Sequence, residues 1–369
     1  MPAAALALFA TACTAAHLGS TALVARRLMR PRPLPQGGTP LITLLRPACG
    51  LDAQDAETLG SSFLQDYPAY EVVFCVARSD DPVVPLLRDL IARHPRIPAR
   101  LLLGEDRITA NPKLNNLQKG WTGSTSAWVA MADSNLLLPP DYLRTLIACW
   151  QGKTGLVSSP PAGIRPEGLA ASIECAFLNG NQARLQLAAD SLGFGFAQGK
   201  TMFWRRDTLD AAGGLPAIAR DLAEDAAATK LVRSLGKRVT LTPRPFAQPI
   251  GKRSLRAVWN RQLRWSRVRR DAFPRFFLLE PVNGPLLPAI ACAAAFGPLP
   301  ALALLKLWYL AEAALLRAAG WPCGWRDLLA MPLRDAMLLP IWLATFASRG
   351  ITWRGTSMQP PGATVLAAE

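Results

Sequence analysis

The chain has 369 residues, half of them hydrophobic, and a formal net charge of +15. A basic, apolar chain of this length has room for one catalytic domain with membrane segments, and it is attracted to anionic lipid headgroups or to nucleic acid. Its basic residues border apolar stretches and no nucleic-acid-binding motif is found, which favours a membrane partner and no nucleic acid. Seven scattered cysteines without a CxxC pair, and only two histidines, argue against a zinc site and for reduced thiols.

Residues 3–25 form an apolar run without Asp, Glu, Lys or Arg, and Arg26, Arg27 and Arg30 follow it closely. A helix of about 20 residues is long enough to cross the hydrocarbon core of a bilayer. A basic cluster beside such a helix stays on the cytoplasmic side, whereas in a signal peptide the basic residues precede the apolar run. Residues 1–32 are therefore predicted to be an uncleaved transmembrane anchor with a basic flank.

Short apolar runs alternate with helical patterns after a Pro- and Gly-rich linker at 33–40. Strands are expected at 41–45, 71–77, 100–103 and 128–132, and helices at 54–65, 82–94 and 111–121. This alternation is typical of a parallel sheet covered by helices on both faces. Ligands bind such sheets at the carboxyl ends of the strands, near the point where the strand order switches. A cytoplasmic catalytic domain is predicted over 33–255.

The second half of this domain combines one long helix with shorter elements. The expected elements are an amphipathic helix over 169–189, a glycine-rich loop over 193–199, strands at 201–204 and 239–241, and a helix over 222–235. Glu224 and Asp225 lie in the first turn of the last helix.

A basic and aromatic segment at 256–282 separates this domain from an apolar C-terminal region. Its central residues include Arg261, Arg264 and Trp265. The planar guanidinium of arginine matches phosphate oxygens, and indole rings are enriched at membrane interfaces. The segment is predicted to lie on the membrane surface and to hold a diphosphate above a lipid acceptor. A purely electrostatic interfacial anchor is the alternative.

The C-terminal region at 283–349 is apolar enough for several transmembrane helices, and a tail follows at 350–369. Spans are expected at 285–305, 307–319 and 329–347. Glu312 lies inside one of these stretches, where an ionisable side chain is rare and needs a partner.

Three groups of carboxylates follow expected strands or open a helix, and all of them can meet at one rim of the sheet. They are Asp80-Asp81, Asp133 and Glu224-Asp225. A nucleotide-sugar transferase needs one acid for the nucleoside, one for a divalent metal on the diphosphate and one as base. Taken singly, the first group also fits an ordinary turn and the last a favourable helix N-terminus. Asp133 is harder to explain in this way, because an unpaired carboxylate after a buried strand is costly.

Together with other residues, these carboxylates form an ordered pattern over roughly residues 40–283. Its members are Asp80-Asp81-Pro82, Asn111-Pro112-Lys113-Leu114-Asn115-Asn116-Leu117, Asp133-Ser134, Gly199, Arg206, Gly213-Gly214, Ala223-Glu224-Asp225 and Arg261-Gln262-Leu263-Arg264-Trp265. In this pattern the chain resembles the bacterial ceramide glucosyltransferases of glycosyltransferase family 21, which are inverting enzymes. The resemblance implies a GT-A-type α/β fold, with a mixed nucleotide-binding sheet, helices on both faces, and terminal transmembrane or interfacial helices.

The resemblance also implies roles on the donor side of the site. Asp81 would contact the uridine, with Asp80 as a close alternative, and Lys113 would be a second contact to the diphosphate. Asp133 would hold the diphosphate through Mg²⁺ or Mn²⁺. Many relatives have a second aspartate two positions later, where this chain has Asn135, a neutral candidate ligand.

On the acceptor side, the resemblance implies that Asp225 is the catalytic base. Arg261, Arg264 and Trp265 would bind the diphosphate and shape the acceptor entrance. The implied reaction is the transfer of a sugar, glucose in the first instance, from a UDP-sugar to the primary hydroxyl of ceramide, giving a β-glycosylceramide. The implied location is the bacterial inner membrane, with several spans and the catalytic domain facing the cytoplasm.

The pattern leaves other acceptors and donors open. A hopanoid acceptor with UDP-N-acetylglucosamine as donor fits the same architecture, although the full match of Asn111 to Leu117 favours ceramide. A non-catalytic scaffold that binds lipid or nucleotide is a second alternative. The presence of Asp133, Asp225 and Arg264 argues against a scaffold.

Overall fold

The structure is a computed structural model that describes residues 2–30, 38–221, 223–347, 351–353 and 356–358. Most of the linker expected at 33–40 and of the tail expected at 350–369 lies outside these residues.

The chain divides into two compact units, and each unit consists of three separate segments of the sequence. The helical unit comprises Met1–Pro31, Ala162–Gly193 and Ile250–Arg349, and the sheet unit comprises Arg32–Pro161, Phe194–Pro249 and Gly350–Glu369. The segment Ala162–Gly193 groups with the helical unit, although the sequence suggested that it belongs to one continuous catalytic segment. The two units are therefore described separately.

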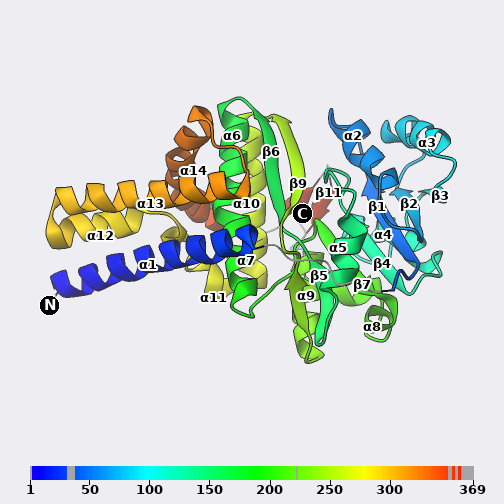
Figure 1. The fold of residues 1–369 in the computed structure, drawn as a ribbon, viewed down its shortest axis with the longest axis horizontal. Helices are drawn as coiled ribbons and strands as arrows, with labels where there is room; N and C mark the ends of the chain where they lie inside the picture. Colours follow the sequence, from blue (N-terminus) through cyan, green and yellow to red (C-terminus); the bar gives the residue numbers. More distant parts are fainter. Residues whose placement is uncertain (1, 31–37, 222, 348–350, 354–355, 359–369) are drawn as a thin grey trace, which may run out of the picture. The chain divides into compact units, whose positions relative to one another are not determined.

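The sheet unit is built on seven strands in the order β3-β2-β1-β4-β7-β5-β8. Figure 1 shows β1, β2, β4 and β7 among them. Their bounds are β1 Ile42–Ala48, β2 Tyr70–Val76, β3 Ala99–Leu103, β4 Trp128–Ala132, β5 Thr154–Ser158, β7 Thr201–Arg205 and β8 Arg238–Leu241. β1 pairs in parallel with β2 and β4, and β3 pairs in parallel with β2. β7 runs antiparallel between β4 and β5, so the sheet is mixed. The strand order switches between β1 and β4, where ligand-binding residues are expected.

Helices follow most of the strands of the sheet unit. They are α2 Asp55–Gly60, α3 Val83–Arg93, α4 Pro112–Thr122, α5 Tyr142–Cys149, α8 Arg206–Asp210 and α9 Glu224–Ser234, with the short turns η1 Ser61–Phe63 and η3 Leu215–Ile218. α3 shows why the sequence predicted them: its buried residues Val83, Val84, Leu87 and Leu90 lie on one face.

Helix α4 lies closely against β1 and β2. A Cβ atom on Gly120 would lie 2.8 Å from Cys75 Sγ and 3.0 Å from Leu45 Cδ2, so the absence of a side chain permits this approach. Leu114 of the same helix is fully buried. The sheet therefore fixes the position of α4, which carries Lys113 in its first turn.

The remaining strands form two small two-stranded sheets. β6 (Pro161–Glu167) pairs with β9 (Phe246–Lys252), and β10 (Ile351–Trp353) pairs antiparallel with β11 (Thr356–Met358). The sequence did not predict β6 or β9, because each contains proline, which counts against a strand.

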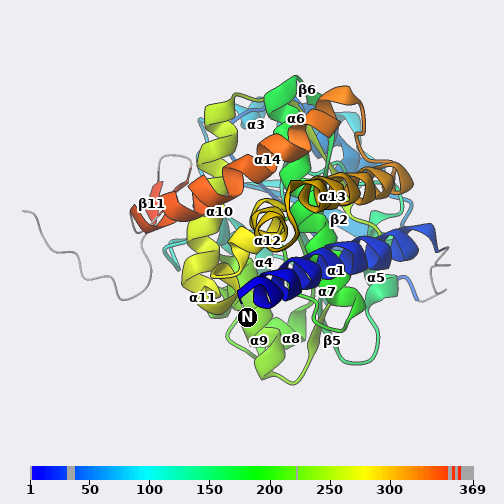
Figure 2. The ribbon, with the colours of Figure 1, turned by 90° about the vertical axis from the view of Figure 1, so that its left-hand side faces the viewer.

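The helical unit consists almost entirely of helices (Figure 2). They are α1 Pro2–Met29, α6 Leu169–Ala176, the π-helix η2 Phe177–Ala183, α7 Arg184–Ser191, α10 Leu255–Ala272, α11 Pro274–Phe277, η4 Glu280–Asn283, α12 Leu286–Phe296, α13 Pro298–Ala319, α14 Trp325–Ala344 and η5 Thr345–Ala347. The long helix expected at 169–189 is present as α6, η2 and α7 in direct succession. α1 packs against α12 and α13, where Ala10, Ala291 and Ala301 allow close approach.

Among the residues that the structure describes, three helices are long and apolar enough to cross a membrane. They are Ala3–Met29, Pro298–Ala319 and Trp325–Ala347, and the shorter Leu286–Phe296 is also apolar. The span expected at 285–305 was wrong, because the chain breaks at Gly297 rather than after residue 305. Gly297 has a φ of 86°, which favours glycine, and Pro298 then begins α13.

The buried carboxylate of Glu312 has the partner that its apolar surroundings require. Arg334 Nη1 donates to Glu312 Oε1 at 2.7 Å and Nη2 donates to Oε2 at 3.0 Å. The same guanidinium binds Asp335 through Nε at 2.9 Å. All three side chains are at most 2% exposed, so Arg334 of α14 pairs with one buried carboxylate on α13 and with a second one on its own helix.

We expect Arg334→Met to destabilise the helical unit by about 3–5 kcal/mol, because it leaves two buried carboxylates without their cation. Glu312→Gln should cost clearly less, since Arg334 then still pairs with Asp335. Thermal unfolding in detergent measures the difference, and Arg326→Met, an exposed arginine on the same helix, is the matched control. Equal effects of all three substitutions would contradict the assignment.

Candidate functional site

Asp133 directly follows β4 at the switch point of the sheet and is held by two lysines. Its Oδ1 forms an ion pair with Lys113 Nζ at 2.7 Å, and its Oδ2 accepts a hydrogen bond from Lys200 Nζ at 2.9 Å. Lys200 Nζ also donates to Asn135 Oδ1 at 3.0 Å. Burial tends to raise the pKa of Asp133, but the two ammonium groups outweigh it and hold this pKa far below its ordinary value. Asp133 is therefore ionised at neutral pH.

The backbone of the loop after β4 is held by a buried arginine of the sheet. Arg46, the one charged residue of strand β1, is completely buried and donates to the backbone carbonyls of Ser134 and Leu136 at 3.2 and 3.1 Å. Burial lowers its pKa to about 10. We did not predict a role for this residue from the sequence, although a charged arginine within the strand sequence ITLLRPA indicates one.

Lys113 links Asp133 to the first turn of α9. Besides Asp133, its Nζ donates to Glu224 Oε1 at 2.7 Å and to the carbonyl oxygen of Gly199 at 2.6 Å. The other oxygen of Glu224 accepts a hydrogen bond from Asn111 Nδ2 at 3.1 Å. Asn111 also caps α4, because its side chain accepts from the backbone N–H of Lys113 at 2.9 Å.

The two following asparagines of the motif bind backbone groups. Asn115 Oδ1 accepts from the N–H groups of Ile108 and Thr109 at 3.1 and 2.9 Å. Asn116 Nδ2 donates to the carbonyl of Cys75, at the end of β2, at 2.7 Å. These bonds connect the loop before α4, and α4 itself, to the carboxyl edge of the sheet.

Asp225 lies next to Glu224 and is held by two backbone N–H groups. Gly199 N donates to Oδ2 at 2.9 Å and Ala226 N donates to Oδ1 at 2.8 Å. Burial, and secondly the negative charge of Glu224, raise the pKa of Asp225 to about 6, although the two N–H groups and Lys113 oppose this shift. A carboxyl group with a pKa near neutrality is suited to accept a proton.

Gly199 contacts this cluster through its backbone carbonyl and N–H groups. A Cβ atom at this position would lie 2.8 Å from Glu224 Oε1 and 3.5 Å from Lys113 Nζ. Glycine therefore leaves room for both side chains, which gives a physical reason for its place in the pattern. Lys200, the next residue, was not expected in the site; the glycine-rich loop before it was the available signal.

Asp80 and Asp81 follow β2 and make different contacts. Asp81 accepts the N–H of Gly50 with both oxygens, at 2.9 Å each, and the N–H of Val83 at 3.0 Å. It therefore joins the loop after β1 to the start of α3. Asp80 is exposed and pairs with Arg78 at 2.6 Å. Contact of either aspartate with a uridine stays a prediction.

The arginine and tryptophan of the basic segment lie on α10, in the helical unit. Arg261 Nη1 donates to Glu174 Oε1 at 2.9 Å, and Glu174 is only 1% exposed. The ring of Trp265 lies 6.0 Å from the Arg261 guanidinium and packs against Cys175 and its neighbours. A role of Arg261, Arg264 and Trp265 at the diphosphate stays a prediction.

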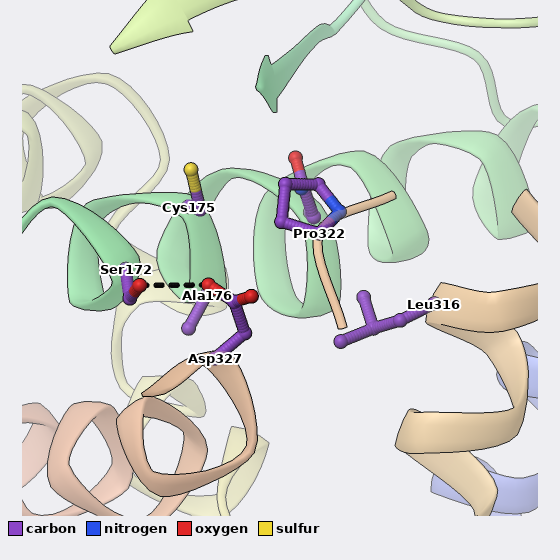
Figure 3. A pocket seen from close by; sticks show the side chains of 7 residues that line it. Ser172, Cys175, Ala176, Leu316, Pro322 and Asp327 are labelled. Carbon is purple, nitrogen blue, oxygen red and sulfur yellow. Dashed lines mark hydrogen bonds between the residues drawn. The ribbon is translucent and has the colours of Figure 1, made fainter. Parts of the chain in front are cut away.

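A small pocket in the helical unit is too small for a sugar nucleotide. Ser172, Cys175, Ala176, Asn179, Leu316, Pro322 and Asp327 line it (Figure 3). Its space is about 10 Å³, which is about enough for one water molecule. Ser172 Oγ donates across it to Asp327 Oδ1 at 2.7 Å.

The oxygens at the end of β4 fit a divalent cation only together with a phosphate ligand. Asp133 and Asn135 supply one carboxylate and one amide oxygen, and the described residues contain no group of three or more His, Cys, Asp or Glu that could hold a metal. Mg²⁺ commonly takes one or two carboxylates and completes its shell with substrate phosphates and water. Because Lys200 already binds both Asp133 and Asn135, a cation at these oxygens has to displace its ammonium.

The fold is similar to that of a mannosyltransferase, PcManGT from Pyrobaculum calidifontis, solved in complex with GDP-Man and Mn²⁺. The TM-score is 0.52 at 22% sequence identity, with 92% of this chain and 95% of that chain covered. This similarity confirms the predicted GT-A-type fold with a mixed central sheet and terminal apolar helices.

Two ceramide glucosyltransferases are similar in sequence. Ceramide glucosyltransferase 1 of Caenorhabditis elegans is 26% identical over 251 residues, which cover 68% of this chain and 54% of that protein. The ceramide glucosyltransferase of Komagataella phaffii is 28% identical over 305 residues, covering 67% of this chain and 60% of that protein. The chain thus spans little more than half the length of these relatives. Residues 3–361 match the family model described as "Glycosyl transferase family 21", and the chain belongs to this family.

Proposed function

We propose that this chain transfers a sugar from a UDP-sugar to the primary hydroxyl of ceramide, with glucose as the first candidate and a β-glycosylceramide as product. The observation that carries the proposal is the cluster of Asp133, Lys113, Glu224 and Asp225 at the carboxyl edge of the sheet. Membership of glycosyltransferase family 21 supports the class of reaction. The names of the similar ceramide glucosyltransferases support glucose as the sugar and ceramide as the acceptor.

Asp225 is the proposed base. Its carboxylate removes the proton from the attacking hydroxyl while the oxygen forms a bond to the anomeric carbon and the bond to UDP breaks. A base in hydrogen-bond reach contributes roughly 10²–10⁴-fold to such a step. A single displacement converts an α-linked donor into a β-glycoside, and it requires no covalent intermediate with the protein.

The donor is proposed to lie along the carboxyl ends of β1 and β4. Asp81 contacts the uridine, and Asp133 with Asn135 holds the cation that accompanies the diphosphate. When bound, Mg²⁺ or Mn²⁺ supplies positive charge to the departing UDP. Lys200, once displaced from Asn135, remains a cation in the neighbourhood of the leaving group.

The helical unit is proposed to bring the lipid acceptor to the site. Three apolar helices support association with a membrane, and the cationic helix α10 is followed by exposed apolar side chains, Phe276, Leu278 and Leu279. Such a segment lies in the headgroup region of a bilayer, where Arg261, Arg264 and Trp265 can shape the acceptor entrance. The proposed location is the bacterial inner membrane, with the sheet unit in the cytoplasm.

A transfer assay in detergent, with Mn²⁺ or Mg²⁺, tests the reaction and names the sugar. Ceramide and a hopanoid polyol are offered with UDP-glucose, UDP-glucuronate and UDP-N-acetylglucosamine. We expect a glycosylceramide whose rate of formation falls by roughly 10²–10⁴-fold in Asp225→Asn. Asp221→Asn, an acid just before the same helix that pairs with Lys230, is the control and should retain activity. Product on the hopanoid alone would overturn the acceptor, and bound UDP without any transfer would favour the scaffold.

The rate should depend on pH through Asp225. Because this carboxyl has its pKa raised to about 6, it is protonated and inactive as a base below that pH, so kcat/KM should fall as the pH decreases through about 6. Glu224→Gln removes a negative charge that raises this pKa, and should therefore move the acidic limb to lower pH. A limb that stays in place in this variant would contradict the assignment of the base.

A further inference from the structure

We infer that Lys113 is a positioning residue, whose ammonium group ties Asp133 on the donor side to Glu224 and Asp225 on the acceptor side through one ion pair and two hydrogen bonds. This inference rests on the proposed function. It gives Lys113 a different role from the diphosphate contact that the sequence suggested.

The ammonium group of Lys113 has three close oxygen partners. Its Nζ donates hydrogen bonds to Glu224 Oε1 at 2.7 Å and to the Gly199 carbonyl oxygen at 2.6 Å, and it forms an ion pair with Asp133 Oδ1 at 2.7 Å. The side chain is only 11% exposed. Contact with a diphosphate would require Lys113 to give up one of these three contacts and leave a largely buried oxygen without its partner, which costs free energy.

The partners of Lys113 are themselves held in place. Pro112 and the Asn111 cap fix the first turn of α4, from which Lys113 extends. Asn111 Nδ2 binds the second oxygen of Glu224 at 3.1 Å, so both Glu224 oxygens have donors from one helix terminus. Lys113 therefore joins two preorganised elements, the start of α4 and the start of α9.

Lys113 reaches Asp225 by two routes. The first route is Glu224, which directly precedes Asp225 in the chain, so that fixing the Glu224 side chain also restrains the first turn of α9. Gly199 is the second route: its carbonyl accepts from Lys113 while its N–H donates to Asp225 Oδ2 at 2.9 Å. Displacement of Lys113 is thus transmitted to both sides of the base, and a misplacement of about 1 Å can cost roughly 10²-fold in rate.

Lys113 also places a basic nitrogen between two carboxylates that would otherwise repel each other. Its Nζ lies 2.7 Å from an oxygen of Asp133 and 2.7 Å from an oxygen of Glu224.

The test compares Lys113→Met and Lys113→Arg with the matched control Lys119→Met, a half-exposed lysine on the same helix. We expect kcat to fall about 10²-fold in both Lys113 variants, because arginine keeps the charge but cannot reproduce contacts to three oxygens from one nitrogen. The Kd for UDP with Mn²⁺ should change by less than about tenfold. Recovery of kcat in Lys113→Arg would overturn the inference, and so would a loss of UDP affinity as large as the loss in kcat.

Two further measurements separate positioning from a merely structural role. Lys113→Met removes a positive charge that lowers the pKa of Asp225, so the acidic limb of the kcat profile should move to higher pH. In the double variant with Glu224→Gln, kcat should be no lower than in the worse single variant, because both substitutions break the same link. Independent effects that multiply would overturn the inference.

The link between Lys113 and Glu224 can also be measured through folding stability, which requires no lipid acceptor. The double-mutant cycle of Lys113→Met and Glu224→Gln, measured by thermal unfolding in detergent, should give a clear coupling between the two residues. If the wild-type chain transfers no sugar to any lipid, the proposed function fails, while this cycle still reports whether Lys113 and Glu224 are linked. Additive effects on stability would contradict the link itself.

Discussion

The donor side of the sheet unit depends on one largely buried ammonium group between two carboxylates. Lys113 Nζ lies within 2.7 Å of oxygens of Asp133, Glu224 and Gly199, which belong to three different parts of the chain. Acidic side chains so close together repel one another unless a cation lies between them. The orientation of Asp133, the first turn of α9 and the loop before β7 all follow from this contact, and through Gly199 so does the position of Asp225.

The first four strands and their parallel direction could be predicted because local rules govern them. Short apolar runs separated by helical patterns imply parallel strands, and a polar residue directly after such a run lies at the carboxyl edge, as Asp133 does. The direction of β7 could not be predicted in this way. Its residues from Thr201 to Trp204 are as buried as those of the neighbouring strands. The amino-acid composition of β7 therefore does not indicate whether the strand runs parallel or antiparallel to them.

The contacts of the site could be predicted only in part, because they join distant residues. The motif around Lys113 was recognised, but Glu224 is 111 residues away and Gly199 is 86 residues away. Only the packing of α4 against the sheet brings them together. Helix 169–189 was predicted as a helix, yet its inclusion in the helical unit depends on what α10 and α14 bury, which no local pattern contains.

The most direct test is an experimental structure of the whole chain with UDP and Mn²⁺ bound. We expect Lys113 Nζ to remain within about 2.7–3.2 Å of both Asp133 and Glu224, while Lys200 leaves Asn135 and Asp225 keeps its bond to the N–H of Gly199. A structure in which Lys113 leaves Glu224 and binds a diphosphate oxygen would contradict it.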